Sequence, residues 1–152
     1  MTASQRLGEL SIELPTPPVP LGAYAPAKRV GTQVLTSGQL PIDADGQIIT
    51  GRLGDGVDTD TGKHAARLAV LRALAAVVTV TGDLDAIREV VRVCVFVNSS
   101  PDFVDQAQVA NGASELLIEV FGEAGRHVRS AVGVAALPAN AVVEVELVVE
   151  AA

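Results

Sequence analysis

The order of apolar and polar residues along the chain predicts five β-strands. Runs rich in valine and isoleucine, several of them alternating with polar residues, span residues 33–42, 47–50, 90–98, 128–134 and 142–150. The sequence DADG separates the first two runs, and its aspartates and glycine are typical of a hairpin turn. We therefore expect the first two strands to be joined by a tight turn.

Two longer segments carry apolar residues at helical spacing. Residues 63–80 are apolar nearly all the way round, which predicts a helix that is buried on several sides. Asp60 or Thr61 is the expected N-cap of this helix, and Gly82 is expected to end it. A second helix is predicted within residues 103–121, where apolar residues recur at the spacing of one helical face.

The first 20 residues have a different character, and we divide the chain into an N-terminal extension (1–20) and a single domain (21–152). Residues 4–10 can form a short helix. Residues 15–20, PTPPVP, must run extended, because proline fixes φ and lacks a backbone donor. The pattern also allows one further strand before Tyr24.

The order of these elements predicts an α+β fold in which two helices pack on one face of a mixed β-sheet. In the last strand, Glu144, Glu146 and Glu150 share one face while apolar residues line the other. Because the helices cover only one face, the second face or the edge of the sheet needs another cover, and a second copy of the chain is the simplest one. We therefore expect a homo-oligomer.

The residues expected on one face of the strand over 90–98 are Val91, Val93, Val95 and Val97.

Composition and charge narrow the possible partners and locations. The 152 residues are 49% hydrophobic, which is enough to bury a core without disulfides or a structural metal. A formal net charge of -7 argues against nucleic acid as a partner. Arg67 and Arg72 interrupt the most apolar run before it reaches the roughly 18 residues that a membrane helix needs. Since Cys94 is the only cysteine and the N-terminus has no signal-peptide pattern, we expect a cytoplasmic protein.

Arg129 is the most informative candidate for chemistry. It shares one strand face with Ala131 and Gly133, whose small size leaves a hollow in front of the guanidinium. A guanidinium binds a carboxylate through two parallel hydrogen bonds, so this pattern suggests an anion-binding pocket. The alternative is an ion pair between Arg129 and Glu144 or Glu146 on a neighbouring strand, and the spacing alone does not decide between the two.

Other candidate motifs carry little weight. His64 and His127 are the only histidines, and with a single cysteine they cannot complete a closed zinc site, so no metal is expected. The DADG turn lacks the later glycine and the final glutamate of a calcium loop. Cys94 lies between valines in a predicted strand, and we interpret it as an inert apolar residue rather than a nucleophile.

Three stretches resemble a known family. TSGQLP at residues 36–41, VFVN at 95–98 and RSAVGVAALPANAVVEVE at 129–146 are similar to motifs of the RidA/YjgF family, whose members are also labelled L-PSP endoribonucleases or translation initiation inhibitors. The resemblance covers about residues 20–150 and is strongest to a longer subgroup with an N-terminal extension. It implies a chorismate mutase-like α+β fold assembled as a homotrimer.

The same resemblance implies roles for individual residues. Arg129 takes the place of the family's carboxylate-binding arginine, and Glu144 matches the glutamate that positions or activates the attacking water. The implied substrate-binding residues are Tyr24, Ser37, Asn111, Arg129 and Ala131. In family trimers these positions meet in clefts between subunits, so one chain would hold half a site.

The implied activity is hydrolysis of enamines and imines, such as 2-aminoacrylate, to 2-keto acids and ammonia, without a metal or organic cofactor. The family's usual cysteine and glutamate after the arginine are replaced here by Ala131 and Gly133. This enlarges the hollow and leaves open a bulkier substrate, or binding without turnover. Two alternatives therefore stand beside the deaminase. One is a non-catalytic trimer that binds a small carboxylate-bearing metabolite. The other is an endoribonuclease or translation inhibitor, against which the acidic charge and the scarcity of aromatic residues argue.

Overall fold

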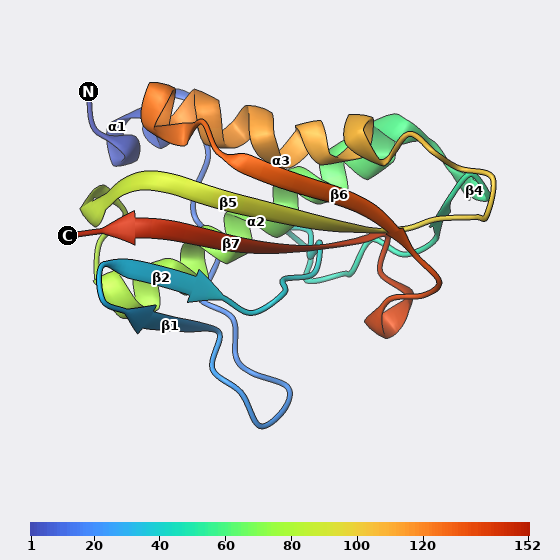
Figure 1. Cartoon of the computed structure of the whole chain (residues 1–152), viewed down its shortest axis with the longest axis horizontal. Helices are drawn as coiled ribbons and strands as arrows, with labels where there is room; N and C mark the ends of the chain where they lie inside the picture. Colours follow the sequence, from blue (N-terminus) through green and yellow to red (C-terminus); the bar gives the residue numbers. More distant parts are fainter.

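The computed structural model describes residues 1–152 and is built around one mixed β-sheet (Figure 1). The sheet has the order β1-β2-β7-β5-β6, in which β5 and β6 are parallel and the other neighbouring pairs are antiparallel. Its strands are β1 (Ala27–Val30), β2 (Gln33–Thr36), β5 (Ile87–Asn98), β6 (Val128–Val134) and β7 (Val143–Ala151). A separate small pair is formed by β3 (Arg52–Leu53) and β4 (Gly56–Val57).

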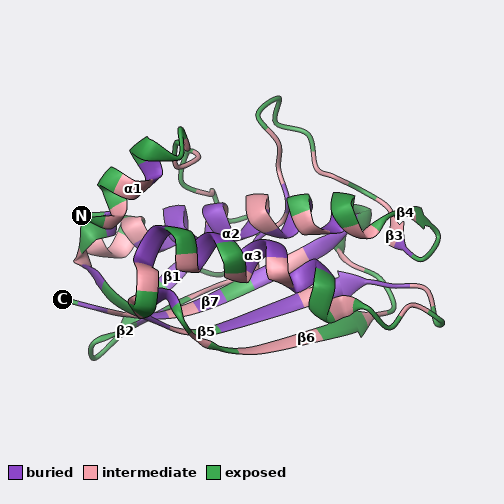
Figure 2. Ribbon diagram, turned by 90° about the horizontal axis from the view of Figure 1, so that it is seen from above, coloured by how far each residue is buried: buried purple, intermediate pink, exposed green.

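The helices lie on one face of this sheet, as Figure 2 shows from above. The long helices α2 (Thr59–Thr81) and α3 (Gln106–Phe121) pack side by side, and the short helix α1 (Ala3–Glu9) packs against α3. Three short 3₁₀ segments complete the fold, namely η1 (Leu84–Ala86), η2 (Gly122–Gly125) and η3 (Pro138–Asn140). This arrangement confirms the predicted α+β fold with helices on one face of a mixed sheet.

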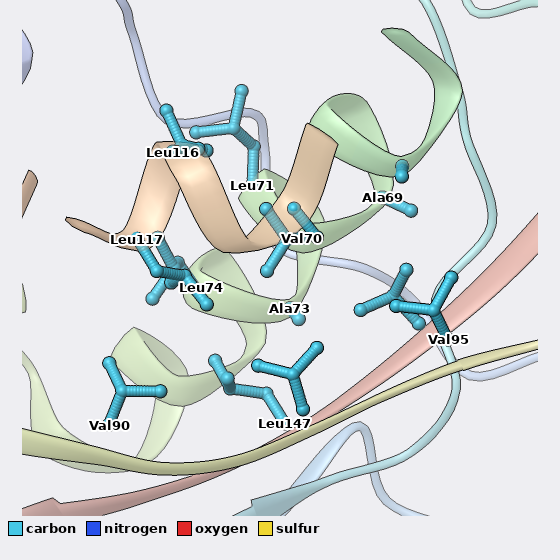
Figure 3. Packing of buried hydrophobic residues seen from close by; sticks show 14 of the residues in the cluster. Ala69, Val70, Leu71, Ala73, Leu74, Val90, Val95, Leu116, Leu117 and Leu147 are labelled. Carbon is cyan, nitrogen blue, oxygen red and sulfur yellow. The ribbon is translucent and has the colours of Figure 1, made fainter. Parts of the chain in front are cut away.

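The core lies between α2, α3 and the sheet (Figure 3). Val70 and Leu74 of α2, Leu116 and Leu117 of α3, and Leu147 of β7 are each at most 1% exposed. Burying a side chain of this size stabilises the fold by about 1.5–3 kcal/mol. The core therefore holds both helices against the strands that carry the candidate site residues.

Helix α2 is buried on several sides, as its pattern predicts. By length and composition it is apolar enough to cross a membrane, but 56% of its most apolar window is buried within the domain. The expectation that Arg67 and Arg72 break the apolar run before it reaches the length of a membrane helix is therefore wrong. The packing of α2 in the core accounts for its apolar composition. Close packing on α3 also requires small residues, because a Cβ on Gly112 would lie 1.9 Å from the Lys63 carbonyl oxygen.

The boundaries of several elements differ from the prediction. The N-cap of α2 is Asp58, not Asp60 or Thr61, because the Asp58 carboxylate accepts the Thr61 backbone N–H, and the helix therefore begins two or three residues earlier than predicted. Gly82 ends α2 in a left-handed conformation, as predicted. The additional strand, β1, comes after Tyr24 rather than before it.

The predicted strands over residues 33–42 and 47–50 are shorter than expected. Strand β2 ends at Thr36, and beyond it only isolated bridges remain, such as the one between Ile42 and Ile48. The turn between them is present, since the Asp43 carboxylate accepts two backbone N–H groups and Gly46 adopts a positive φ of 79°. Beyond Thr36 the segment keeps one bridge to β7, between Gln39 and Val145, and lines a cavity described below.

The predicted alternation in β5 is correct only for its second half. Val93, Val95 and Val97 are fully buried, but Val90 is buried in place of Val91. The pairing of β5 with β7 shifts register between Val90 and Arg92, and this irregularity reverses the faces that the preceding residues occupy.

The N-terminal residues pack closely against the rest of the chain. Leu7 is only 5% exposed and belongs to the core. The Ser4 backbone N–H donates to the Asp85 carboxylate at 2.8 Å, and Arg6 Nη1 donates to the Val120 carbonyl at 3.3 Å. Residues 13–20 then cross the surface without helix or strand structure.

No helix covers the face of the sheet opposite α2 and α3 (Figure 2). The predicted division of β7 is confirmed, with valines and a leucine buried against the helices and the glutamates on the other face. Leu35, Val128 and Val132 lie on that open face and are 40%, 62% and 44% exposed. An apolar sheet surface of this kind is typical of an interface.

Candidate functional site

Arg129 lies on the edge strand β6 and points to the helix side of the sheet, since its register partner is the buried Val93. Its Nη1 donates to Asn111 Oδ1 at 2.8 Å and to Ser114 Oγ at 3.2 Å, and its Nη2 reaches the Ala107 carbonyl at 3.4 Å. All three partners are neutral groups of α3, and Arg129 makes no salt bridge. The guanidinium is therefore held in place while its charge remains available to an anion.

This geometry rules out the ion pair that the sequence left open. Strand β5 lies between β6 and β7, so β7 is not the neighbour of β6. Glu144 and Glu146 pair with Phe96 and Cys94 on the open face of the sheet, whereas Arg129 faces the helices. The parallel β5–β6 pairing, which the spacing does not reveal, is the reason.

A histidine completes the hydrogen-bond chain behind Arg129. His127 Nδ1 lies 2.6 Å from the Gly125 carbonyl, which can only accept, so Nδ1 carries a proton, and in the neutral ring that burial favours Nε2 is the unprotonated nitrogen. Ser114 Oγ, 2.8 Å from Nε2, must then donate to it and accept from Arg129. Burial lowers the pKa of His127, the Gly125 hydrogen bond opposes this, and the charge of Arg129 lowers the pKa further. The chain thus fixes the direction of every hydrogen bond around Arg129.

The hollow in front of Arg129 is not where the sequence placed it. A Cβ on Gly133 would lie 2.9 Å from Gln106 Nε2, so Gln106 fills the space that the missing side chain leaves. Ala131 packs against the core. A cavity of about 220 Å³ instead opens beside Arg129 toward Arg126 and His127. The expectation that Gly133 enlarges the hollow is therefore wrong.

A second group of predicted residues lies around Glu144, in a cavity that we name the Glu144 cavity. Its volume is about 200 Å³, and Glu144, Tyr24 and Gly38 line it. Gly38 leaves room for the Glu144 carboxyl group, because a Cβ on it would lie 2.6–2.8 Å from that group and displace it. Ser37 holds the loop that carries Tyr24, since its hydroxyl donates to the Ala25 carbonyl at 2.6 Å.

The surroundings of Glu144 favour the protonated carboxyl group. Burial raises the pKa of Glu144, and the negative charge of Glu146 raises it further. A carboxylate with a raised pKa is a stronger general base than an exposed one. Glu144 is thus suited to take a proton from water and return it.

One chain does not bring the two groups together. Arg129 and Asn111 lie at the β6 edge on the helix side, while Glu144 lies on the central strand β7, beyond β5, with Tyr24 and Ser37 near it. No three His, Cys, Asp or Glu side chains converge where they could hold a metal ion.

Sequence reasoning missed three residues that shape these clusters. Ser114 lies one helical turn after Asn111, and this i, i+3 spacing is a signal that could have placed both on the face toward Arg129. Gly38 lies within the SGQ motif but was not assigned a role. Arg72, which also lines the Glu144 cavity, carries no local signal because a long-range contact places it there.

Comparison with known proteins now identifies the family. The family described as "YjgF/chorismate mutase-like, putative endoribonuclease" matches residues 4–151, nearly the whole chain. The chain belongs to the RidA/YjgF family. Among solved structures, this RidA/YjgF protein is similar to protein Atu1372 of unknown function from Agrobacterium tumefaciens, with 43% identity, a TM-score of 0.90, and coverage of 99% of this chain and 92% of the other.

Two curated relatives of this RidA/YjgF protein differ in what their names state. Protein TCP17 of Trypanosoma cruzi is 47% identical over 96% of this chain and 90% of its own length. The 2-iminobutanoate/2-iminopropanoate deaminase of Dermatophagoides farinae is 32% identical over 91% of this chain and 93% of its own length. The RidA/YjgF family therefore includes imine deaminases, and one of them aligns with nearly all of this chain.

Proposed function

We propose that this RidA/YjgF protein hydrolyses 2-imino acids to 2-keto acids and ammonia. The observation that carries the proposal is the state of Arg129, whose guanidinium is oriented by Asn111 and Ser114 but neutralised by no carboxylate. Such a group matches the carboxylate that every 2-imino acid carries. The deaminase relative supports this choice of substrate class.

The second element of the proposal is a homotrimer with shared active sites. Arg129 and Glu144 face opposite sides of the sheet in one chain, so a substrate held by both requires two chains. The exposed apolar face around Val128 and Val132 supports such an assembly. Members of this family are typically homotrimers, in agreement with this requirement.

The proposed reaction needs one water and two proton transfers. Arg129 of one subunit holds the carboxylate, and Glu144 of a neighbour accepts a proton as water adds to the imine carbon, which forms a carbinolamine. The protonated Glu144 returns that proton to the nitrogen, which gives the neutral carbinolamine. Glu144 then carries the hydroxyl proton to the same nitrogen as the C–N bond breaks, so that the carbon keeps a C=O bond and ammonia leaves. Imine and water are thereby converted to 2-keto acid and ammonia with all atoms accounted for.

The test is turnover of 2-iminobutanoate, generated in situ by an amino-acid oxidase, with wild type and Arg129→Met compared. We expect ammonia release by the wild type and a loss of about 100-fold or more in the variant, because a buried charge–carboxylate contact is worth several kcal/mol. Arg88→Met, an exposed arginine at the start of β5, serves as the matched control and should keep full activity.

The outcomes separate the candidate functions. Wild-type release at the uncatalysed rate would refute the deaminase, and butyrate binding that depends on Arg129 would then identify a non-catalytic carboxylate-binding protein. RNA cleavage is disfavoured by the net charge of -7. A salt-dependent RNA-binding titration with wild type tests that alternative directly.

A further inference from the structure

Arg72 of α2 lies between two cavities that meet near the N-terminal segment. On one side it lines the Glu144 cavity, together with Tyr24 and Glu144. On the other side it lines a larger cavity of about 510 Å³, whose walls include Glu13 and Asp43. A single guanidinium therefore borders both spaces.

No group of the protein neutralises or binds this guanidinium. Arg72 makes no salt bridge, and its buried Nε–H has no hydrogen-bond partner. Glu13, Asp43 and Glu144 line the two cavities, yet none of them forms an ion pair with Arg72. Burial lowers the pKa of Arg72, but arginine stays charged in proteins. A half-buried charge without a partner is costly, and a buried donor without an acceptor needs an explanation.

The walls around Arg72 are rigid and partly supplied by the N-terminal segment. Pro18, Val19 and Pro20 line the Glu144 cavity, and prolines restrict the backbone that carries them. Of the Arg72 guanidinium, the Nε–H is buried beneath this wall, and a buried donor of this kind is strongly attracted to an anion. The N-terminal residues thus help to shape the cavity that Arg72 and Glu144 both line.

We infer that Arg72 binds a second anionic group of the ligand, so that the preferred substrates are 2-imino dicarboxylic acids. The inference rests on the proposed function for the position of the first carboxylate, which Arg129 of a neighbouring subunit holds. Glu144 and Arg72 line one cavity, so the side chain of a substrate whose imine carbon lies at Glu144 can extend through that cavity to Arg72. A terminal carboxylate there supplies the partner that the protein lacks.

The test is a binding measurement that does not depend on turnover. Calorimetric titration of the assembled protein with glutarate and with butyrate compares a dicarboxylate with a monocarboxylate. We expect wild type to bind glutarate at least about 10-fold more tightly than butyrate, and Arg72→Met to reduce this ratio to about one. Arg67→Met removes the same charge from the outer face of α2, where Arg67 pairs with Glu119, and should keep the wild-type ratio.

The possible results each decide the inference. Equal affinity of wild type for the two acids, absence of glutarate binding, or a glutarate preference that persists in Arg72→Met would overturn it. If Arg72→Met fails to fold, Arg72→Gln provides the same comparison with a polar side chain in the cavity. Imine hydrolysis is measured separately. A glutarate preference without turnover would refute the proposed deaminase alone, and turnover without the preference would refute the role of Arg72 alone.

Discussion

At the scale of single residues, Glu144 illustrates a conflict between stability and chemistry. Burial and Glu146 both raise the pKa of Glu144, so the charged form is less stable in the folded protein than in the unfolded chain. The folded state therefore binds the proton more tightly than the unfolded chain does. Protonated Glu144 stabilises the fold fully at pH values below the pKa that it has in the unfolded chain. This stabilisation is lost as the pH rises through the pKa that Glu144 has in the folded protein. Replacing the carboxylate removes this cost at neutral pH.

We therefore predict opposite effects of Glu144→Gln on stability and on activity. Imine hydrolysis should fall by about 100-fold or more, because the amide cannot take a proton from water. The free energy of unfolding of Glu144→Gln in urea, minus that of wild type, should increase when the pH is raised from about 4 to 7. A difference between the two proteins that does not change with pH would contradict the raised pKa.

His127 provides a second prediction with the opposite dependence on pH. Its pKa is lowered, mainly by burial, so the unfolded chain binds a proton more readily than the folded protein. Stability should thus decrease as the pH falls below about 6.5, the ordinary value for histidine, until the folded pKa is reached. Denaturant unfolding of wild type and His127→Gln at several pH values measures this. The free energy of unfolding of His127→Gln should decrease less than that of wild type as the pH falls. Curves of this free energy against pH that run parallel for the two proteins would contradict the prediction.

At the scale of elements, the packing of α2 on α3 depends on Gly112. A Cβ at this position would overlap the Lys63 carbonyl oxygen, and backbone cannot move aside as a flexible side chain can. We predict that Gly112→Ala destabilises the protein by about 1–3 kcal/mol despite the higher helix propensity of alanine. Gly8 in α1 is the control, since nothing lies within 4 Å of its added Cβ. Gly8→Ala should be neutral or slightly stabilising, and equal melting temperatures for both variants would contradict this account.

Strands and helices could be predicted where one local pattern dominates. The alternation in β7 was sufficient to separate Glu144 from Leu147 by face, because the strand is regular and has one buried side. In β5 the alternation did not predict which residues face the core before Arg92, because the register shift near Val90 depends on the pairing with β7 and not on the sequence of β5 alone. The helix start at Asp58 was missed because three neighbouring residues have suitable capping side chains.

At the scale of the whole molecule, the proposed function requires that Arg129 and Glu144 meet across an interface. Two inactive variants, Arg129→Met and Glu144→Gln, then complement each other when their subunits are mixed. In a randomly mixed ring, about a quarter of the sites combine an intact arginine with an intact glutamate. We predict recovery of about that fraction of wild-type activity, measured as ammonia release after co-refolding of the two variants.

Two observations accompany this mixing experiment. Size-exclusion chromatography with light scattering should give a mass of three chains for each preparation. Mixtures of Arg129→Met with itself under two different tags serve as the control and should stay inactive. Persistent inactivity of the Arg129→Met and Glu144→Gln mixture, at the correct mass, would show that the site is not shared.

The sequence by itself determined the α+β class, the buried helix α2, the two-faced strand β7 and, through its motifs, the family. These features follow from periodicity and turn chemistry over short stretches of chain. Only the tertiary structure decided that β5 separates β6 from β7, which removes the ion pair of Arg129 with Glu144. It also brought Ser114 and His127 behind Arg129, and placed Arg72 and Glu144 in the lining of one cavity. Strand order and contacts between distant residues depend on how the whole core packs, and no local pattern records that.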